Sequence, residues 1–190
     1  MAEDKRENIL DAATDVFSRY GFHGAKMEDI AKEANIGKGT IYGYFDSKES
    51  LFYEIIKHGI KEYEKGINMA LGIDGDLEEQ IYTLCRFHGE YIDRYIGISQ
   101  IIIMEKEILS TELMKDIVAE KTKLFNKIKD AVEKAIYSGE LREGLDPELA
   151  AIIIIGSTNQ FYGQKICYEK KDYKDIDPKD LIEIILGGLK

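Results

Sequence analysis

The chain has 190 residues, of which 44% are hydrophobic, and it carries a formal net charge of −10 at pH 7. This composition supplies enough apolar surface for a globular core and excludes a disordered chain. The excess of acidic residues argues against general affinity for nucleic acids, which depends on neutralising phosphates. Any DNA-binding surface must therefore be a local cationic patch.

Other classes are disfavoured by short stretches of the sequence. The most apolar run, LAAIIIIG at 149–156, is far shorter than the roughly 18 residues of a membrane span. The N-terminal MAEDKRENIL is too charged for a secretory signal. We therefore expect a soluble, cytoplasmic protein with no membrane partner. Cys85 and Cys167 fit no disulfide or zinc motif, and although Cys85 and His88 share a helix face, the further ligands of a metal site are not found.

Apolar residues recur at helical spacing along the whole chain, and no long stretch alternates with period two. This pattern predicts an all-α protein of about nine helices. The first helix should end at Gly21, where glycine can take the left-handed conformation. Two Asp-Pro pairs, Asp146-Pro147 and Asp177-Pro178, each predict the start of a helix.

A short second helix is expected to follow the first. Its apolar face holds Met27, Ile30, Ala31 and Ala34. Asn35 is a plausible end for this helix, and Ile36-Gly37 then leads into KGTIYGYF at 38–45. Two short helices joined by three or four residues that include a glycine predict a helix-turn-helix, with the second helix as the recognition helix.

The recognition helix carries two glycines, each of which should cost about 1 kcal/mol relative to alanine. Helical geometry places Ile41 and Phe45 on the core face and therefore puts Gly39 and Gly43 on the outward face. One interpretation is a frayed surface turn. The other is a bare strip that approaches DNA closely, because the neighbouring side chains can reach phosphates. These neighbours are Lys38, Thr40, Tyr42 and Tyr44.

Lys48 lies at or just before the first turn of the next helix, whether Asp46 or Ser47 caps that helix. The helix dipole disfavours a cation at this end. A lysine becomes useful there if a phosphate binds at the helix terminus. The alternative interpretation is an ordinary solvated lysine.

The stretch from about residue 7 to 52 resembles the DNA-binding domain of the TetR family of transcriptional repressors. The resemblance rests on A-x-x-x-F-x-x-x-G-F in the first helix, M-x-x-I-A-K-E-A in the second, and K-G-T-I-Y-x-Y-F followed by S-K-E-x-L-F. It implies a DNA-binding domain at 1–47 and a ligand-binding and dimerisation domain at 48–190. It also implies that Lys38, Gly39 and Thr40 approach bases or the adjacent backbone, and that phosphates are held by Tyr42, Tyr44 and Lys48.

The chain departs from the family pattern at two positions. Lys26 replaces the usual serine or threonine cap of the second helix; it cannot cap, but it can reach a phosphate. Gly43 replaces an often larger residue, so a side chain that could read a base edge is missing. We therefore expect Lys26 and Gly43 to join the DNA-facing surface, with DNA shape and backbone contacts contributing more to recognition.

The resemblance implies a homodimer formed by the eighth and ninth helices and a ligand cavity enclosed by the fourth to seventh. The helix of Leu149–Ile155 is apolar nearly all round, and the helix of Leu181–Leu189 adds a second apolar stripe, which agrees with that interface. Candidate ligand-lining residues are aromatic or polar residues on core-facing stripes, although such residues are also typical of a plain core. They are Tyr63, Phe87, His88, Tyr91, Tyr95, Met104, Phe125, Asn159 and Tyr162.

The sequence thus predicts a homodimeric repressor that binds a pseudo-palindromic DNA operator and is released by a partly apolar small-molecule effector. Its two reading heads should lie about 34 Å apart or somewhat more. The fourth helix is expected to link the reader to the ligand domain. The alternative is a ligand-sensing or interaction module whose DNA binding is weak or lost. No catalytic triad, metal set, phosphate loop or cofactor motif is found, so neither an enzyme nor a cofactor is expected.

Overall fold

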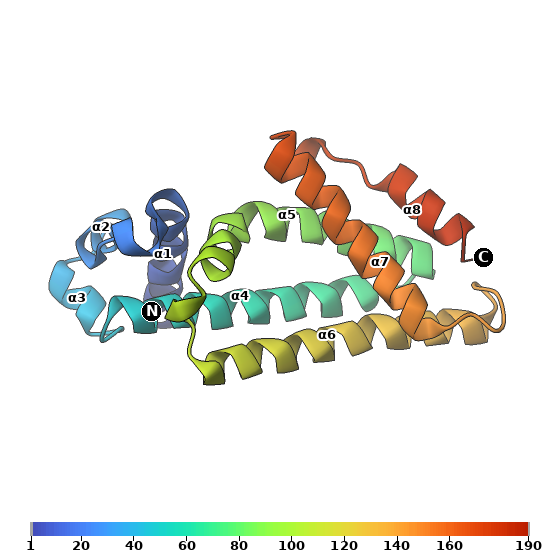
Figure 1. Ribbon diagram of the computed structural model, residues 1–190, viewed down its shortest axis with the longest axis horizontal. Coiled ribbons are helices and arrows are strands. Elements are labelled where there is room, and N and C mark those ends of the chain that lie inside the picture. Colours follow the sequence, from blue (N-terminus) through green and yellow to red (C-terminus); the bar gives the residue numbers. More distant parts are fainter. Residues whose placement is uncertain (1, 190) are drawn as a thin grey trace. The chain divides into compact units, whose positions relative to one another are not determined.

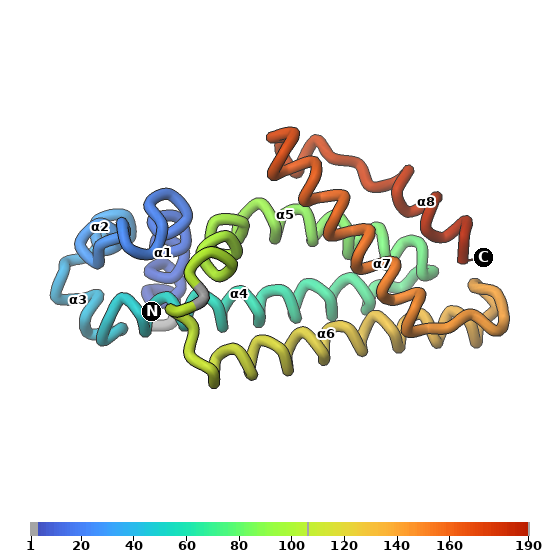
Figure 2. The backbone as a smooth tube through the Cα atoms, viewed as in Figure 1, coloured from blue at the N-terminus to red at the C-terminus, as the bar shows by residue number. Residues whose placement is uncertain are grey.

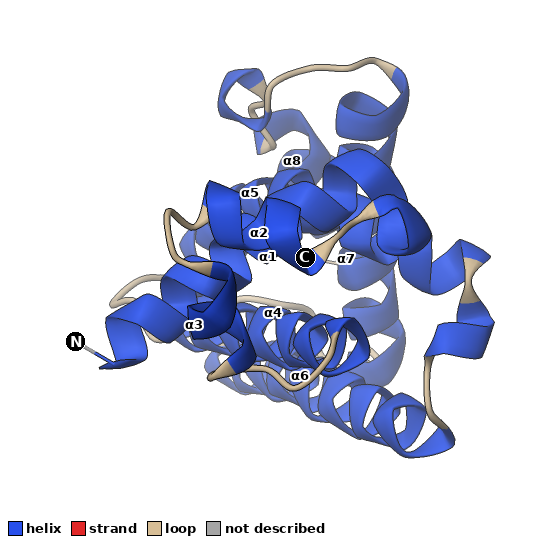
Figure 3. Cartoon of the chain, turned by 90° about the vertical axis from the view of Figure 1, so that its left-hand side faces the viewer, coloured by secondary structure: helices blue, strands red, loops and turns tan. Residues whose placement is uncertain are grey.

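The computed structural model describes residues 2–189, and every regular element in this range is a helix (Figure 3). The α-helices are α1 Ala2–Gly24, α2 Met27–Glu33, α3 Lys38–Tyr42, α4 Lys48–Leu71, α5 Leu77–Met104, α6 Thr111–Ser138, α7 Pro147–Tyr162 and α8 Lys179–Gly187 (Figure 1). Short helical turns occur at Lys106–Ile108, Gly163–Tyr168 and Tyr173–Asp175. The all-α class is confirmed, and α7 and α8 are the helices expected as the eighth and ninth. None of the described helices is long and apolar enough to cross a membrane.

The chain forms two compact units. Unit 1 runs to Lys61 and also includes Tyr95–Ile117. Unit 2 consists of Glu62–Arg94 and the chain from Val118 onward. Helices α4, α5 and α6 therefore each contribute to both units, as their continuous traces in Figure 2 show. The division of function between 1–47 and 48–190 stays a prediction.

The end of α1 follows the expected interruption at Gly21. This residue has φ 69° and ψ 173°, which is not helical, although the helix resumes as far as Gly24. A positive φ favours glycine because it has no Cβ. The break lets Phe22 turn back onto the core, where its ring centroid lies 5.8 Å from that of Phe17 and 5.3 Å from that of Phe52.

Unit 1 joins the first three helices to the second half of α5. Gly97 on α5 lies directly on α1, because a Cβ at this position would come within 2.4 Å of the Ser18 Cβ. Beyond α5, the Tyr53 hydroxyl donates to the Ile108 carbonyl at 2.6 Å. The Glu105 carboxylate lies 3.0 Å from His23 Nε2. The segment 95–117 therefore packs with the helix-turn-helix as one body.

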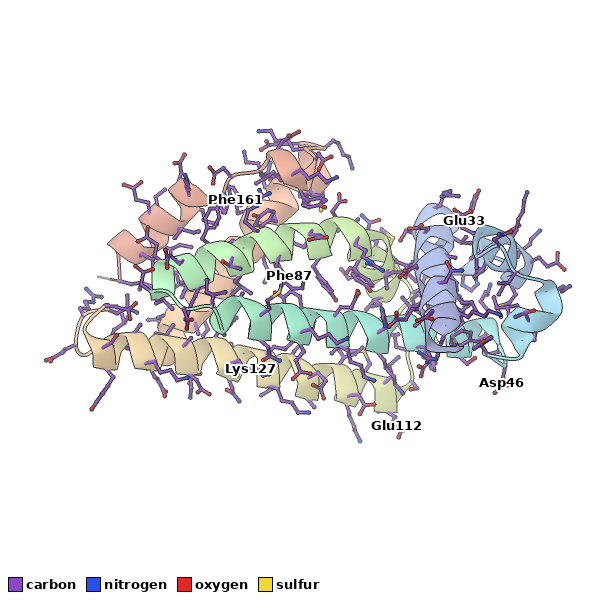
Figure 4. All side chains as sticks on the ribbon, turned by 180° about the vertical axis from the view of Figure 1, so that it is seen from behind. Glu33, Asp46, Phe87, Glu112, Lys127 and Phe161 are labelled. Carbon is purple, nitrogen blue, oxygen red and sulfur yellow. The ribbon has the colours of Figure 1, made fainter. Side chains whose placement is uncertain are left out.

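Unit 2 contains the large apolar core of α7, α8 and the adjoining parts of α4, α5 and α6. Both Asp-Pro pairs start helices as expected. The Asp146 carboxylate accepts from the backbone N–H groups of Glu148 and Leu149, with Pro147 as the first residue of α7. Within this unit α4 and α6 lie side by side, and Lys127 on α6 reaches Glu64 and Asn68 on α4 at 3.0 and 2.6 Å (Figures 1 and 4).

Candidate DNA-binding and effector sites

Helices α2 and α3 form the expected helix-turn-helix. Met27, Ile30 and Ala31 on α2 and its C-cap Ala34 are buried, and the next residue, Asn35, turns the chain away with a positive φ of 53°. Ile41 in α3 and Phe45 just beyond it are buried, whereas Gly39 and Gly43 are exposed. The predicted core and solvent faces of both helices are therefore confirmed.

Helix α3 is shorter than the eight residues of KGTIYGYF. It ends at Tyr42, and Gly43 forms its C-cap with φ −75° and ψ −17°. Only Gly39 therefore lies within the helix, so about half of the expected penalty for the two glycines is absent. A Cβ at Gly43 would lie 3.2 Å from the Thr40 carbonyl oxygen, so alanine would crowd this last turn.

The outward side of this motif carries most of the predicted DNA-contacting groups. Lys26, Lys38, Thr40 and Tyr42 are exposed, and Tyr44 is half-buried. Lys26 precedes α2 in an extended conformation, and its side chain caps no N–H group among the described residues. Lys38 forms an ion pair with Glu28, which lowers the pKa of that carboxyl. The cation expected to meet DNA is thus partly neutralised in the free protein.

We expect Glu28→Gln to raise affinity for any DNA sequence several-fold at low salt. The substitution releases Lys38 and removes a negative charge from the surface that would face phosphates. Fluorescence anisotropy with random and promoter duplexes over a range of salt concentrations would measure the effect. Asp11→Asn is a matched control on the exposed side of α1. Equal affinities of Glu28→Gln and the control would contradict a role for Lys38 at the DNA surface.

Lys48 has a structural role that sequence reasoning missed. Ser47 caps α4, since Ser47 and Ser50 exchange backbone-to-hydroxyl hydrogen bonds of 3.1 Å, and Lys48 is the first residue of the helix. Its ammonium donates to the carbonyls of Phe22 at 2.8 Å and Ala25 at 3.2 Å and lies 4.6 Å from the Phe22 ring centroid. Through these contacts Lys48 holds the first turn of α4 against the end of α1. Its contact with phosphate stays a prediction.

Five of the nine candidate ligand residues gather in unit 2, and we call them the aromatic cluster. They are Tyr63, Phe87, His88, Tyr91 and Tyr162. Tyr63 forms a 2.8 Å hydrogen bond with His88 Nδ1, and its ring centroid lies 5.7 Å from Phe87 and 4.6 Å from Tyr91. The His88 and Tyr162 centroids are 5.9 Å apart. Figure 4 shows Phe87 between α4 and α5.

The other four candidates lie outside this cluster, although the Asn159 side chain interacts with His88. Phe125 is half-buried against the core of unit 2, and Asn159 is exposed on α7. Tyr95 is buried but belongs to unit 1. The expectation that Met104 faces the core is wrong: this residue ends α5, and its side chain is 82% exposed. Helical spacing predicted a common face but not where α5 leaves the core.

Two glycines let the aromatic cluster pack tightly. A Cβ at Gly66 on α4 would come within 2.1 Å of the Phe87 ring, and one at Gly89 on α5 within 2.4 Å of the Tyr162 ring. Each ring therefore rests on the backbone of a neighbouring helix. Three described surface grooves of unit 2, of about 640, 630 and 450 Å³, are lined by residues outside the cluster.

Burial keeps the cluster uncharged. It lowers the pKa of His88 to about 4, with Asn159 nearby opposing the shift, and it raises the pKa of Tyr63. On the neighbouring turn of α5, burial raises the pKa of Cys85 to about 11, against the effect of its Thr158 contact. His88 is therefore a neutral imidazole at physiological pH.

The neutral His88 predicts an acid-sensitive stability. Its native pKa of about 4 lies below the ordinary 6.5, so between these values the unfolded chain binds a proton that the native state does not. Its contribution is complete above pH 6.5 and falls by up to about 1.4 kcal/mol per pH unit as acid is added. Urea unfolding of wild type and His88→Asn at pH 7 and pH 5 should show a smaller difference at pH 5. A pH-independent difference would contradict burial of a neutral imidazole.

Comparison with known proteins agrees with this architecture. Residues 9–55 match the model for bacterial regulatory proteins of the tetR family, and residues 74–163 match that for the tetracyclin repressor-like C-terminal domain. Together these two matches cover more than half of the chain. The chain belongs to the TetR family of transcriptional regulators.

Several individual proteins are similar to this chain along most of its length. The uncharacterized HTH-type regulator YhgD of Bacillus subtilis is 28% identical over 160 residues, covering 82% of this chain and 81% of YhgD. The structure of FadR from Bacillus subtilis with stearoyl-CoA superposes with a TM-score of 0.74 at 23% identity, covering 97% and 99% of the two chains. The structure of AibR with isovaleryl coenzyme A and operator DNA has a TM-score of 0.65 at 21% identity, covering 97% of each chain. Both structures share the fold.

Proposed function

We propose that the protein is a homodimeric transcriptional repressor that binds a pseudo-palindromic operator and is released by a small-molecule effector bound in unit 2. The observation that carries this proposal is the second helix of the helix-turn-helix. Ile41 and Phe45 anchor it in the core, while Lys38, Gly39 and Thr40 face solvent together. A short helix with a bare, hydroxyl-bearing and cationic outer face suits insertion into a major groove.

Dimerisation is supported by an apolar surface on α7 and α8. Leu149, Ile152 and Ile153 on α7 are 54, 52 and 39% exposed, and Ile184 on α8 is 76% exposed. Helical spacing places Leu149, Ile152 and Ile153 on one side of α7, and α7 contacts α8. Exposed apolar patches of this kind mark interaction sites. A two-fold axis at this face would cover the patch with its own copy.

The proposed effector is an acyl-coenzyme A. The similar fold of FadR holds stearoyl-CoA, and that of AibR holds isovaleryl coenzyme A. In the present chain, the aromatic cluster offers an apolar environment suited to an acyl chain, with the hydrogen-bonded Tyr63 and His88 as polar groups within it.

Two helices support a coupling of effector to DNA. Helix α4 carries Tyr63 in unit 2 and Lys48 in unit 1, as the sequence predicted for the linking helix. Helix α5 carries His88 in unit 2 and Gly97, which packs on α1, in unit 1. An effector that binds one arrangement of these helices more tightly than the other would shift the population of DNA-competent dimers.

A second candidate function is a sensor module with weak DNA binding. It is favoured by one observation: the Lys38 ammonium pairs with Glu28, and that of Lys48 is held by backbone carbonyls. Two of the three predicted DNA-contacting lysines must therefore exchange partners before they bind phosphate, and the third is Lys26. This exchange would lower affinity and leave sensing intact.

Gel shifts with the DNA upstream of the protein's own gene separate these two candidates. The proposed repressor should shift this DNA at low salt in preference to a random duplex of equal length. Equal binding to both duplexes, or binding to neither, would reject the operator proposal and favour the sensor module.

A further inference from the structure

His88 and Tyr162 carry two buried polar atoms that the fold leaves unsatisfied. His88 is 5% exposed and Tyr162 is 0% exposed. Within residues 2–189, neither His88 Nε2 nor the Tyr162 hydroxyl finds a hydrogen-bond partner. Such a group costs about 1–3 kcal/mol, and native proteins contain few of them. Both lie in the aromatic cluster, on rings from α5 and α7 that contact each other.

The Tyr63 hydrogen bond fixes the chemical character of the His88 atom. A phenol hydroxyl is a good donor and a weak acceptor, whereas an unprotonated imidazole nitrogen is a strong acceptor, so Tyr63 is the favoured donor in this hydrogen bond. Tyr63 therefore donates to Nδ1, and the proton of the neutral ring lies on Nε2. The pKa of His88, lowered by burial to about 4, is consistent with this neutral form. Nε2–H and the Tyr162 O–H are thus two unused donors.

Two neighbouring polar groups leave these donors unused. The Asn159 side chain interacts polarly with His88 and raises its pKa, but it does not reach hydrogen-bond geometry with Nε2. Arg86 is near enough to lower the pKa of Tyr162, but its guanidinium donates to the Ile176 carbonyl at 2.6 Å. An anionic ligand group would consequently enter the cluster without a dedicated cation, which is unfavourable in a buried site. Two neutral donors suit a neutral oxygen acceptor.

We infer that His88 Nε2–H and the Tyr162 hydroxyl together bind the thioester carbonyl oxygen of the acyl effector. This inference rests on the proposed function, because it takes an acyl-coenzyme A as the effector. The carbonyl oxygen satisfies both orphaned donors, and the acyl chain takes the place of the ring that rests on Gly66 or Gly89. The same displacement acts on the backbones of α4 and α5, which continue into unit 1.

The test compares stearoyl-CoA with S-octadecyl-CoA, a thioether that has a methylene in place of the carbonyl. Isothermal titration calorimetry would measure the binding of both compounds to wild type, Tyr162→Phe and His88→Asn. In His88→Asn the side-chain oxygen still accepts from Tyr63 while the Nε2 donor is lost. Tyr82→Phe, a half-buried tyrosine on α5 outside the cluster, is the matched control.

Wild type and Tyr82→Phe should bind the thioester at least tenfold more tightly than the thioether. In Tyr162→Phe and His88→Asn this preference should fall to about threefold or less, while thioether affinity stays within about twofold of wild type. Thermal unfolding keeps the test interpretable, because Tyr162→Phe removes only an unsatisfied hydroxyl and should be at least as stable as wild type.

Three outcomes would count against the inference in distinguishable ways. Equal binding of thioester and thioether by wild type would show that the carbonyl is not recognised. An unchanged preference in both variants would show that other groups recognise it. In either case the proposed effector stands. Failure of wild type to bind either compound would instead reject the acyl-coenzyme A effector and this inference with it.

Discussion

Replacing Ile152 and Ile153 with glutamate should convert the dimer into a monomer and weaken operator binding at least a hundredfold. Both side chains project from α7 with 52 and 39% exposure, so the substitutions leave the core of unit 2 intact. In a dimer they would place four carboxylates in an apolar interface without partners, and burying an unpaired charge costs several kcal/mol.

Operator affinity should fall because a monomer has only one DNA-binding domain. A dimer that holds one half-site presents its other head at millimolar effective concentration, and a monomer loses this advantage. Analytical ultracentrifugation would give the oligomeric state, and anisotropy with a promoter duplex would give affinity. The control is Met69→Glu with Val118→Glu, which adds the same charges at exposed apolar positions on α4 and α6. A dimeric α7 variant, or a control that also dissociates, would contradict this interface.

Lys48→Ala should weaken binding to every DNA sequence and also destabilise the free protein. The loss of a phosphate contact should lower affinity for random and promoter DNA alike and reduce the salt slope by about 1. Removal of the ammonium also leaves the carbonyls of Phe22 and Ala25 without this donor, and hydrogen bonds to charged groups contribute about 1.5–3 kcal/mol. A fall of about 2 kcal/mol in the free energy of unfolding is expected.

These two effects are separable because one requires DNA and the other does not. Urea unfolding measures the structural contribution, and anisotropy at a temperature where the variant remains folded measures the DNA contribution. Lys57→Ala, an exposed lysine further along α4, is the matched control. A destabilised variant with unchanged DNA affinity would leave Lys48 with a purely structural role and would favour the sensor module.

The helix-turn-helix could be predicted from sequence because its determinants are local. The spacing of Met27, Ile30 and Ile41 sets the core faces, and the Asp146-Pro147 pair sets the start of α7, as the structure confirms. The fate of Lys48 could not be predicted, since its carbonyl partners are more than 20 residues away and become available only where α1 breaks at Gly21.

The proposed effector site was still harder to predict from the sequence, because it is formed by contacts between helices. Helical spacing placed Tyr63, His88 and Tyr91 on core-facing stripes, but periodicity carries no information about which stripes meet. The approach of Phe87 to Gly66 is a tertiary contact for which the sequence offers only a glycine within a helix. Tyr95 and Met104 share a helix with His88, yet they lie beyond the point where α5 passes into unit 1.

The central claim, that effector binding in unit 2 controls DNA binding, is tested most directly by one titration. Labelled DNA from upstream of the gene is saturated with protein at low salt, and its anisotropy is followed as stearoyl-CoA is added, with free coenzyme A as the control. The proposed repressor should leave the DNA as stearoyl-CoA saturates it and should remain bound with coenzyme A alone. A complex that persists with stearoyl-CoA demonstrably bound to the protein would contradict this account.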